Sequence, residues 1–361
     1  MIFTAIISNK DDPGLGQATI PFPIPDNEYD HTIGLLEDMG IGSPTAQDCR
    51  VDGMDSTYPI LNRLVAQSVN VDELDYLAKR LDSFCAGEDA QFQAMAEKLD
   101  LTNIRDFINL TFCCQQTTVI TDFSDLERIG RAHYMNVNGG CANTEELENL
   151  DGEETARLLI SDGAGVVTPY GVVYDNGMKL EPLYDGRHFP AYLYKPPLMV
   201  LEVNPDPAGT AAGCLYLPCP DRQLQRTLLR AEQGQEGFRM EVTMDELPSE
   251  VSNMVSPTRD SFDSLNALCR AIEPLNSEQR EKLAAVVLMT GAESANEVRQ
   301  LAENLDQFDF VPKSDSPMAD SALTELGYVA YHGSLTLEEL MMDGSAEQQQ
   351  QEMQEMGGMA Q

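Results

Sequence analysis

Apolar residues recur with helical spacing in three stretches of the first half of the chain. In each stretch they are three or four positions apart, which places them on one buried face of a helix. The residues that define the three faces are Leu74, Leu77, Ala78 and Leu81; Phe92, Met95 and Leu99; and Ile104, Phe107, Ile108 and Phe112. Further on, Ser124-Asp125-Leu126-Glu127 has the form of a capping box and predicts a helix that runs through Tyr134.

Short apolar runs bounded by turn residues predict strands. Residues 3–8 and 18–22 predict a hairpin, and residues 117–121 predict another short strand. Gly14-Leu15-Gly16 lies between the first two runs. Because it precedes a strand and not a helix, we interpret it as a turn and not as a phosphate-binding loop.

The same order of elements begins again in the second half, which indicates an internal duplication. The paired features are the strands 3–8 and 198–203, the strands 18–22 and 215–217, the turns Pro23-Ile24-Pro25-Asp26 and Pro218-Cys219-Pro220-Asp221, the helix openings Leu61-Asn62-Arg63-Leu64 and Leu265-Asn266-Ala267-Leu268, and the strands 117–121 and 308–311. In the second copy Ser294-Ala295-Asn296-Glu297 caps a helix just before the last strand.

Between the copies the pattern favours strands. Residues 166–174 and 179–184 predict a hairpin around the turn Asp175-Asn176-Gly177. We therefore expect an elongated α+β protein of two tandem units joined by a small β-rich connector. The predicted division is 1–160 for the first acidic α+β unit, 161–195 for the connector, 196–340 for the second unit and 341–361 for a Gln/Met-rich, low-complexity tail.

The net charge of the chain excludes one class of function. The 361 residues include 60 acidic and 23 basic ones, a formal charge of −37. A protein that binds nucleic acid by neutralising phosphates needs a basic surface, so this class is excluded. Residues 1–160 and residues 196–361 each carry 28 acidic and 10 basic residues, whereas residues 161–195 carry 4 and 3. Both predicted units are therefore acidic, and the charge is not concentrated in a tail.

Three features that the sequence lacks bear on the expected location of the protein in the cell. No apolar run reaches the about 18 residues of a membrane span, and Met1-Ile2-Phe3-Thr4 has no basic start of a signal peptide. The eight cysteines are scattered without a CxxC pair, which is typical of reduced thiols. We expect a soluble, cytoplasmic protein.

Many acids fall on the polar faces of predicted helices, where rows of carboxylates resemble a row of phosphates. Helical neighbours are roughly 5–6 Å apart, and duplex DNA presents one charge per about 1.7 Å of its axis. An acidic run is more often only a solvated helix face, so charge alone leaves both interpretations open. The residues predicted as phosphate surrogates are Asp72, Asp75, Asp82, Glu88, Asp89, Asp122, Asp125, Glu127, Glu145, Glu146, Glu148, Asp151, Glu153 and Glu154.

Several of these residues lie in segments with a family resemblance. After the N-terminal strand pair come Leu61-Asn62-Arg63-Leu64, Val71-Asp72-Glu73-Leu74-Asp75-Tyr76-Leu77-Ala78-Lys79-Arg80-Leu81 and Asp125-Leu126-Glu127-Arg128-Ile129-Gly130. Over residues 1–160, and faintly in the second copy, this pattern resembles the ArdA antirestriction proteins of mobile genetic elements. The resemblance implies an acidic, elongated, usually dimeric DNA mimic that occupies the DNA-binding groove of type I restriction-modification enzymes.

The resemblance also implies the partner. The partner would be a basic DNA-binding protein, namely a type I restriction-modification enzyme. The chain itself would contact neither nucleic acid nor membrane and would have no catalytic activity and no cofactor. The chain departs from the family in its length, its connector and its tail. A tandem chain supplies in one polypeptide what the family builds from two, so a homodimer stays an open alternative.

Two other functions stay open. A non-mimic adaptor would use the connector or the methionines of the tail, and a metal-dependent hydrolase would need a carboxylate site that spacing alone cannot reveal. His133 with Cys141 and Cys113-Cys114 is a weak zinc candidate, because structural zinc ligands normally come in closely spaced pairs. No P-loop, GxSxG or HExxH motif is present.

Overall fold

The computed structural model describes residues 1–203, 213–231, 238–241, 247–256, 259–312 and 328–331. The chain forms two compact units, Met1–Tyr194 and Lys195–Gln361. Antiparallel sheets and helices occur in both units, which confirms the α+β class. The predicted tail, 341–361, lies outside the described residues.

The first unit begins with a four-stranded antiparallel sheet. Its strands lie in the order β2 (Gln17–Phe22), β1 (Phe3–Asn9), β3 (Cys49–Ser56) and β4 (Ser68–Val69). Alternate residues of β2 are buried, as expected for a strand with one face on the core. Helix α1 (Asp26–Asp38) contributes Tyr29, Ile33 and Leu36 to the same core. The predicted hairpin is therefore confirmed.

A run of helices completes the core of this unit. It comprises η2 (Pro59–Leu64), α2 (Val71–Asp82), α3 (Glu88–Lys98), α4 (Ile104–Leu110) and η3 (Cys114–Gln116). The buried side chains include Leu74, Leu77, Phe92 and Phe107, so the helical spacing in the sequence identified the correct faces of these helices. The prediction was wrong for Leu99, which follows the end of α3 and is 40% exposed, and Phe112 lies beyond the end of α4 and is only partly buried. The rings of Phe92 and Phe107 are 5.9 Å apart.

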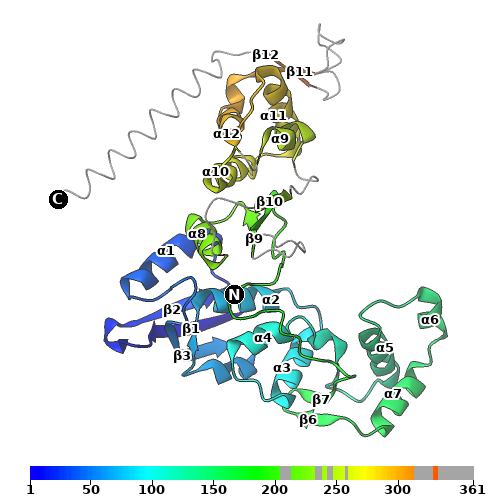
Figure 1. Ribbon diagram of the computed structural model, residues 1–361. Helices are drawn as coiled ribbons and strands as arrows, with labels where there is room; N and C mark the ends of the chain where they lie inside the picture. The colour runs from blue at the N-terminus through cyan, green and yellow to red at the C-terminus, as the bar shows by residue number, and fades with distance from the viewer. Residues whose placement is uncertain (204–212, 232–237, 242–246, 257–258, 313–327, 332–361) are drawn as a thin grey trace. The chain divides into compact units, whose positions relative to one another are not determined.

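A second, smaller sheet carries a group of three helices. Its strands lie in the order β5 (Thr118–Ile120), β7 (Gly171–Tyr174) and β6 (Val166–Thr168). Between β5 and β6 the chain forms α5 (Leu126–Val137), α6 (Thr144–Asn149) and α7 (Gly152–Ser161). We call residues 121–165 the helical arm. Its three helices lie together next to β6 and β7 in Figure 1.

The predicted connector differs from the observed structure. Strand β7 pairs with β5 of the first unit, so residues 161–194 belong to that unit and do not form a separate element. The partner of β7 in a hairpin is β6, and residues 179–184 form no strand. The turn at Asn176 and Gly177 does exist, with positive φ at both residues, but it does not join two paired strands.

The last residues of the first unit are held by aromatic contacts. We call residues 184–194 the strap. Tyr184 is fully buried, and its Oη donates to Glu73 Oε1 at 2.9 Å. Phe189 stacks between Tyr184 and Tyr76, with ring centroids 4.9 and 4.5 Å apart. These contacts fasten the strap to α2.

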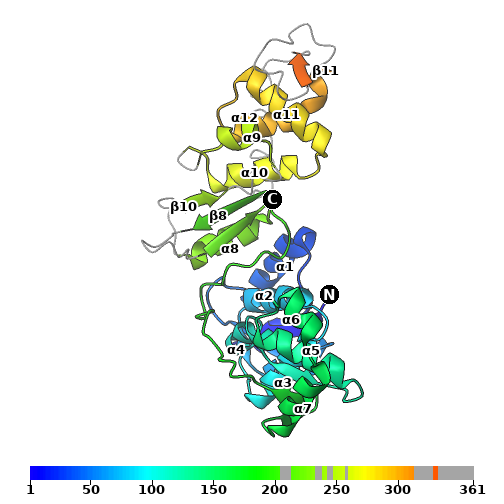
Figure 2. The ribbon, with the colours of Figure 1, turned by 90° about the vertical axis from the view of Figure 1, so that its right-hand side faces the viewer.

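The second unit contains a three-stranded sheet and a group of helices. The sheet has the order β10 (Phe238–Glu241), β8 (Met199–Val203) and β9 (Gly213–Leu217), and α8 (Asp221–Arg230) follows β9. Figure 2 shows the packed group of α9 (Ser249–Met254), α10 (Phe262–Ile272), α11 (Ser277–Thr290) and α12 (Ala295–Glu303). After η4 (Leu305–Gln307), β11 (Asp309–Pro312) pairs with β12 (Tyr328–Tyr331).

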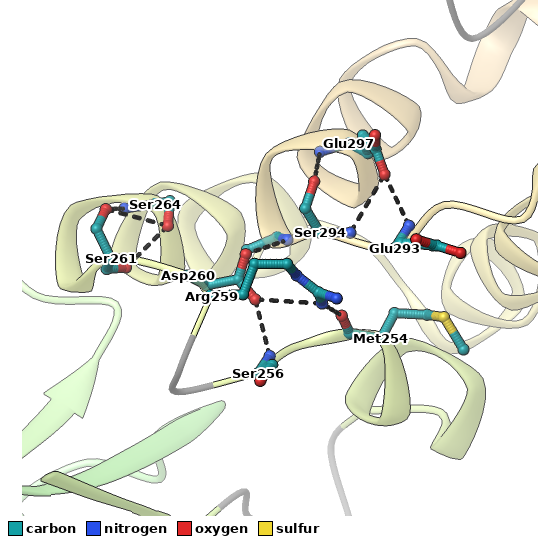
Figure 3. A network of polar contacts seen from close by, with 10 residues as sticks. Met254, Ser256, Arg259, Asp260, Ser261, Ser264, Glu293, Ser294 and Glu297 are labelled. Carbon is teal, nitrogen blue, oxygen red and sulfur yellow. Dashed lines mark hydrogen bonds and ion pairs between the residues drawn. The ribbon is translucent and has the colours of Figure 1, made fainter.

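A buried carboxylate ties this helical group together (Figure 3). Asp260 Oδ1 accepts a hydrogen bond from Ala295 N at 2.9 Å, and its Oδ2 accepts one from Ser256 N at 2.8 Å. Ser294 caps α12 and Glu297 completes the capping box, as predicted. The Asp260 carboxylate thus joins the segment after α9 to the start of α12.

The two units share an order of elements. The strand order β2-β1-β3 matches β9-β8-β10, and the pair β5-β7 matches β11-β12. In both units the residue between the two prolines donates its N–H to the fifth residue of a helix. Ile24 N donates to Asp75 Oδ1 at 2.8 Å, and Cys219 N donates to Asn266 Oδ1 at 2.9 Å. The duplication itself stays a prediction.

Two local predictions were wrong. Residues 265–268 lie inside α10, which begins at Phe262, and so do not open a helix, whereas residues 61–64 form the 3-10 helix η2. In the arm, the N-cap of α5 is Asp125 and not Ser124, since Asp125 accepts a hydrogen bond from Arg128 N.

Candidate functional site

The predicted phosphate surrogates occupy three places in the first unit. Asp72, Asp75 and Asp82 lie on α2, and Glu88 and Asp89 lie in the first turn of α3. The other nine are on the arm or at its start: Asp122, Asp125, Glu127, Glu145, Glu146, Glu148, Asp151, Glu153 and Glu154.

Asp75 is not a surface residue, so its assignment to the outer face of α2 is wrong. It is 5% exposed. Besides its bond from Ile24 N, it pairs with Lys79 Nζ at 2.7 Å, one helical turn further along. Burial opposes the charge on Lys79, yet the adjacent Asp75 carboxylate raises the pKa of Lys79 above its ordinary value. This pair holds the hairpin to α2 and is unsuited to imitating phosphate.

The other two predicted phosphate surrogates of α2 accept hydrogen bonds from tyrosines. Asp72 Oδ1 accepts from Tyr29 Oη at 3.0 Å, and Asp82 Oδ2 accepts from Tyr194 Oη of the strap. Burial and the hydrogen bond to Asp82 raise the pKa of Tyr194. Asp72 is half-buried and Asp82 is exposed. Both therefore serve packing inside the unit, although Asp82 still faces solvent.

The start of α3 is the second acidic place. Glu88 Oε2 accepts from Cys85 N at 2.8 Å, and Asp89 is exposed. Acids in the first turn are favourable because the helix dipole is positive there. Burial, followed by the charges of Asp89 and Asp82, raises the pKa of Tyr58 to about 12. Burial is thus the main reason that Tyr58 keeps its proton, and the carboxylates of Asp89 and Asp82 act in the same direction.

The arm depends on a close contact between two helices. A Cβ atom on Gly130 of α5 would lie 1.9 Å from the carbonyl oxygen of Gly152 of α7, a distance no side chain can adopt. A Cβ atom on Gly152 would lie 2.5 Å from the carbonyl oxygen of Glu127. Ile129 and Ala156 fill the small core beside this crossing. The two glycines thus let α5 and α7 touch backbone to backbone.

Several carboxylates of the arm build its helices. Asp125 caps α5 and Asp151 caps α7, where Asp151 Oδ1 accepts from Glu154 N at 2.9 Å. Glu127 pairs with Arg131 at 2.6 Å, and Glu153 pairs with Arg157. Hydrogen bonds from Ser124 lower the pKa of Asp122. These hydrogen bonds and ion pairs hold the carboxylates in position.

The same carboxylates remain on the surface. The side chains of all nine predicted acids of the arm are exposed. Tyr134 Oη donates to Glu146 Oε2 at 3.1 Å, which joins α5 to α6 without covering the carboxylate. The arm, residues 121–165, has ten acidic and three basic residues, a formal charge of −7. Of all the predicted sites, the arm thus presents the largest group of exposed charges.

The thiols and the weak zinc candidate are not brought together as a metal site. Within the described residues, no group of three or more His, Cys, Asp and Glu side chains is placed to hold a metal ion. All eight cysteines lie in described positions, and none of them forms a disulfide. Burial raises the pKa of Cys113 to about 11 and that of Cys269 to about 12, so both are protonated.

Sequence reasoning missed the glycines of the arm and the tyrosines of the strap. A glycine inside a helical pattern costs about 1 kcal/mol relative to alanine, so Gly130 was a detectable signal of a close contact. The partner of that contact, Gly152, is 22 positions away and lies in another helix. No local pattern connects them.

Every helix within the described ranges is too short or too polar to traverse the hydrocarbon core of a bilayer.

The arm is an exposed set of carboxylates on three short helices, each of which has a side-chain cap at its start. Such a surface attracts cationic groups and speeds encounter with a basic partner.

In comparisons with protein-family models, curated proteins and solved structures, the chain matched none.

Proposed function

We propose that this protein is a DNA mimic that inhibits type I restriction-modification enzymes by occupying their DNA-binding cleft. The observation that carries the proposal is the arm, where nine predicted phosphate surrogates are exposed on capped helices. The resemblance of residues 1–160 to the ArdA antirestriction proteins supports the same function. In this proposal the −37 charge of the chain is the means of competition with DNA.

The mechanism is stoichiometric occupation. Complementary charge raises the association rate, and many weak carboxylate–cation pairs then hold the complex. No bond is made or broken. Since the energy is spread over many pairs, each exposed pair contributes only about 0.2–1 kcal/mol, and single substitutions have small effects.

The direct test is displacement of DNA. A type I enzyme is bound to a fluorescent duplex, and the purified full-length protein is added while anisotropy is followed. We expect release of the duplex at near-equimolar protein, with potency that falls steeply as NaCl rises from 50 to 300 mM because exposed charges are screened. Retention of the duplex at 50 mM NaCl with excess protein would contradict mimicry and favour an adaptor role.

A matched pair of triple variants tests whether the arm is the surface that competes with DNA. Glu145, Glu146 and Glu148 of the arm are replaced by Gln in one variant. In the control, three exposed glutamates of the second unit are replaced: Glu273, Glu281 and Glu293. Both variants change the net charge by +3. We expect only the arm variant to weaken displacement, by about threefold to 150-fold, because three exposed pairs together contribute about 0.6–3 kcal/mol. Equal losses would mean that overall charge, and not the arm, determines binding.

A further inference from the structure

The arm contains a solvent-open cavity that the proposed function does not use. Its volume is about 660 Å³. Helix α5 provides His133 and Val137, the C-terminal part of α7 provides Leu158 and Leu159, and the turn after β7 provides Asn176. The remaining lining residues are Ser161 and Asp162.

Two of the lining residues, His133 and Asn176, are held in place by the hydroxyl group of Thr118. Thr118 Oγ1 accepts from Asn176 Nδ2 at 2.9 Å and from Asn136 Nδ2 at 3.3 Å, and it lies 2.9 Å from His133 Nδ1. A threonine hydroxyl has two acceptor positions and one proton, so its proton is left for His133 Nδ1. His133 is then neutral with its own proton on Nε2. Burial lowers the pKa of His133, which favours the same neutral form.

Two apolar side chains on the walls face solvent. Val137 is 50% exposed and Leu158 is 62% exposed. Single exposed apolar residues are common and need no explanation. Here the two line one concave space from opposite helices, which is the arrangement that receives an apolar side chain of a partner.

The charges around the cavity are negative. Glu154, Leu158 and Asp162 are four positions apart, so they follow one side of α7 with a carboxylate before and after the leucine. Asp162 lines the cavity itself. On the same helix the charge of Arg157 is paired with that of Glu153. An occupant therefore needs an apolar face flanked by positive charge.

We propose that the cavity between α5 and α7 binds a cationic amphipathic helix of a partner protein, with an apolar side chain between Val137 and Leu158 and with Lys or Arg residues at Glu154 and Asp162. A helix presents such residues three or four positions apart, which matches the spacing on α7. This inference goes beyond DNA mimicry, because it adds an apolar anchor that salt does not screen. Its test needs no restriction enzyme, so the two proposals can fail separately.

The probe is a fluorescein-labelled 14-residue peptide of Leu and Lys at helical spacing, and binding to the full-length protein is measured by anisotropy. We expect saturable one-to-one binding that persists in 0.5 M NaCl, where unspecific attraction to an acidic protein is largely screened. A peptide with Glu in place of Lys is expected not to bind. A peptide that keeps Lys but has Ser in place of Leu is expected to lose binding in 0.5 M NaCl.

Substitutions test the walls. Leu158→Ser is expected to weaken binding in 0.5 M NaCl at least tenfold, whereas Leu35→Ser, at a 45% exposed leucine of α1, is the matched control without effect. The double variant Glu154→Gln with Asp162→Asn is expected to weaken binding mainly at 50 mM NaCl. Because these residues are not buried, circular dichroism should show unchanged folding.

Two results would overturn the inference. Equal affinities of Leu158→Ser and Leu35→Ser would mean that the peptide binds elsewhere. Sedimentation that shows a dimer of the unmodified protein, converted to a monomer by Leu158→Ser, would mean that a second copy of this chain occupies the cavity.

Discussion

At the residue scale, the same residue type has opposite roles depending on burial. Asp75 is 5% exposed and serves packing, whereas Glu145 and Glu148 are exposed on α6. A buried carboxylate must be paired and hydrogen-bonded to offset its desolvation, and Asp75 meets this condition through Lys79 and Ile24 N.

Removal of the Asp75 carboxylate should expose this role. We expect Asp75→Ala to lower the free energy of unfolding of the first unit by about 3–5 kcal/mol, since Lys79, whose side chain is 14% exposed, then loses its ion-pair partner. Asp75→Asn should cost less, because it keeps an acceptor for Ile24 N as Asn266 does for Cys219. Urea unfolding followed by circular dichroism measures both. Asp89→Ala, an exposed acid, is the control with a loss below about 1 kcal/mol, and a similar loss for Asp75→Ala would contradict the assignment.

His133 makes stability depend on pH. Its pKa in the folded state is below the ordinary 6.5, so the unfolded chain binds the proton first as pH falls. We therefore expect stability to decrease as pH falls below about 6.5, until the folded-state pKa is reached. His133→Gln should reduce this dependence. Urea midpoints between pH 7.5 and 5 test it, and parallel curves for the two proteins would show that His133 does not contribute.

At the element scale, the arm forms because two helices cross at glycines. Gly130 and Gly152 allow a backbone contact, and only a small core of side chains including Ile129 and Ala156 supports it. In the chain the arm lies between β5 and β6, and the strap, which follows β7, is held to α2. The placement of the acidic helices therefore depends on a few contacts.

The crossing can be broken by a single methyl group. We expect Gly130→Ala to destabilise the arm by more than the about 1–3 kcal/mol typical of overpacking, because the clash is with backbone and not with a movable side chain. Hydrogen exchange of peptides that cover α5 and α7 should become faster, while α2 and α3 stay protected. Ala132→Leu, at an exposed position of α5, adds bulk without a clash. Similar exchange in both variants would contradict the role of the glycines.

At the scale of the whole molecule, both units carry a large excess of acids over bases. Such an excess repels itself in the folded state, and the repulsion is relieved by salt or by a basic partner. The ion pairs on the surface, such as Glu127 with Arg131, stabilise the folded state, but each of them contributes little to the free energy of unfolding.

Salt should therefore stabilise the protein. We expect the thermal midpoint to rise when NaCl is increased from 50 to 500 mM, by a few degrees for each ~1 kcal/mol of repulsion removed. Thermal unfolding followed by circular dichroism measures the change in midpoint. A peptide of Lys residues, added at 50 mM NaCl, should also raise the midpoint. A midpoint that falls with NaCl would show that native ion pairs outweigh the repulsion.

The sequence by itself determined the α+β class, the N-terminal hairpin, the buried faces of α2, α3 and α4 and the acidic character of both halves. These features are local, because helical periodicity, strand alternation and composition are written in neighbouring residues. Only the tertiary structure decided that Asp75 is buried, that β7 pairs with β5 and that Gly130 meets Gly152. Each of these joins residues far apart in the chain, and such contacts depend on how the elements pack, which no local pattern specifies.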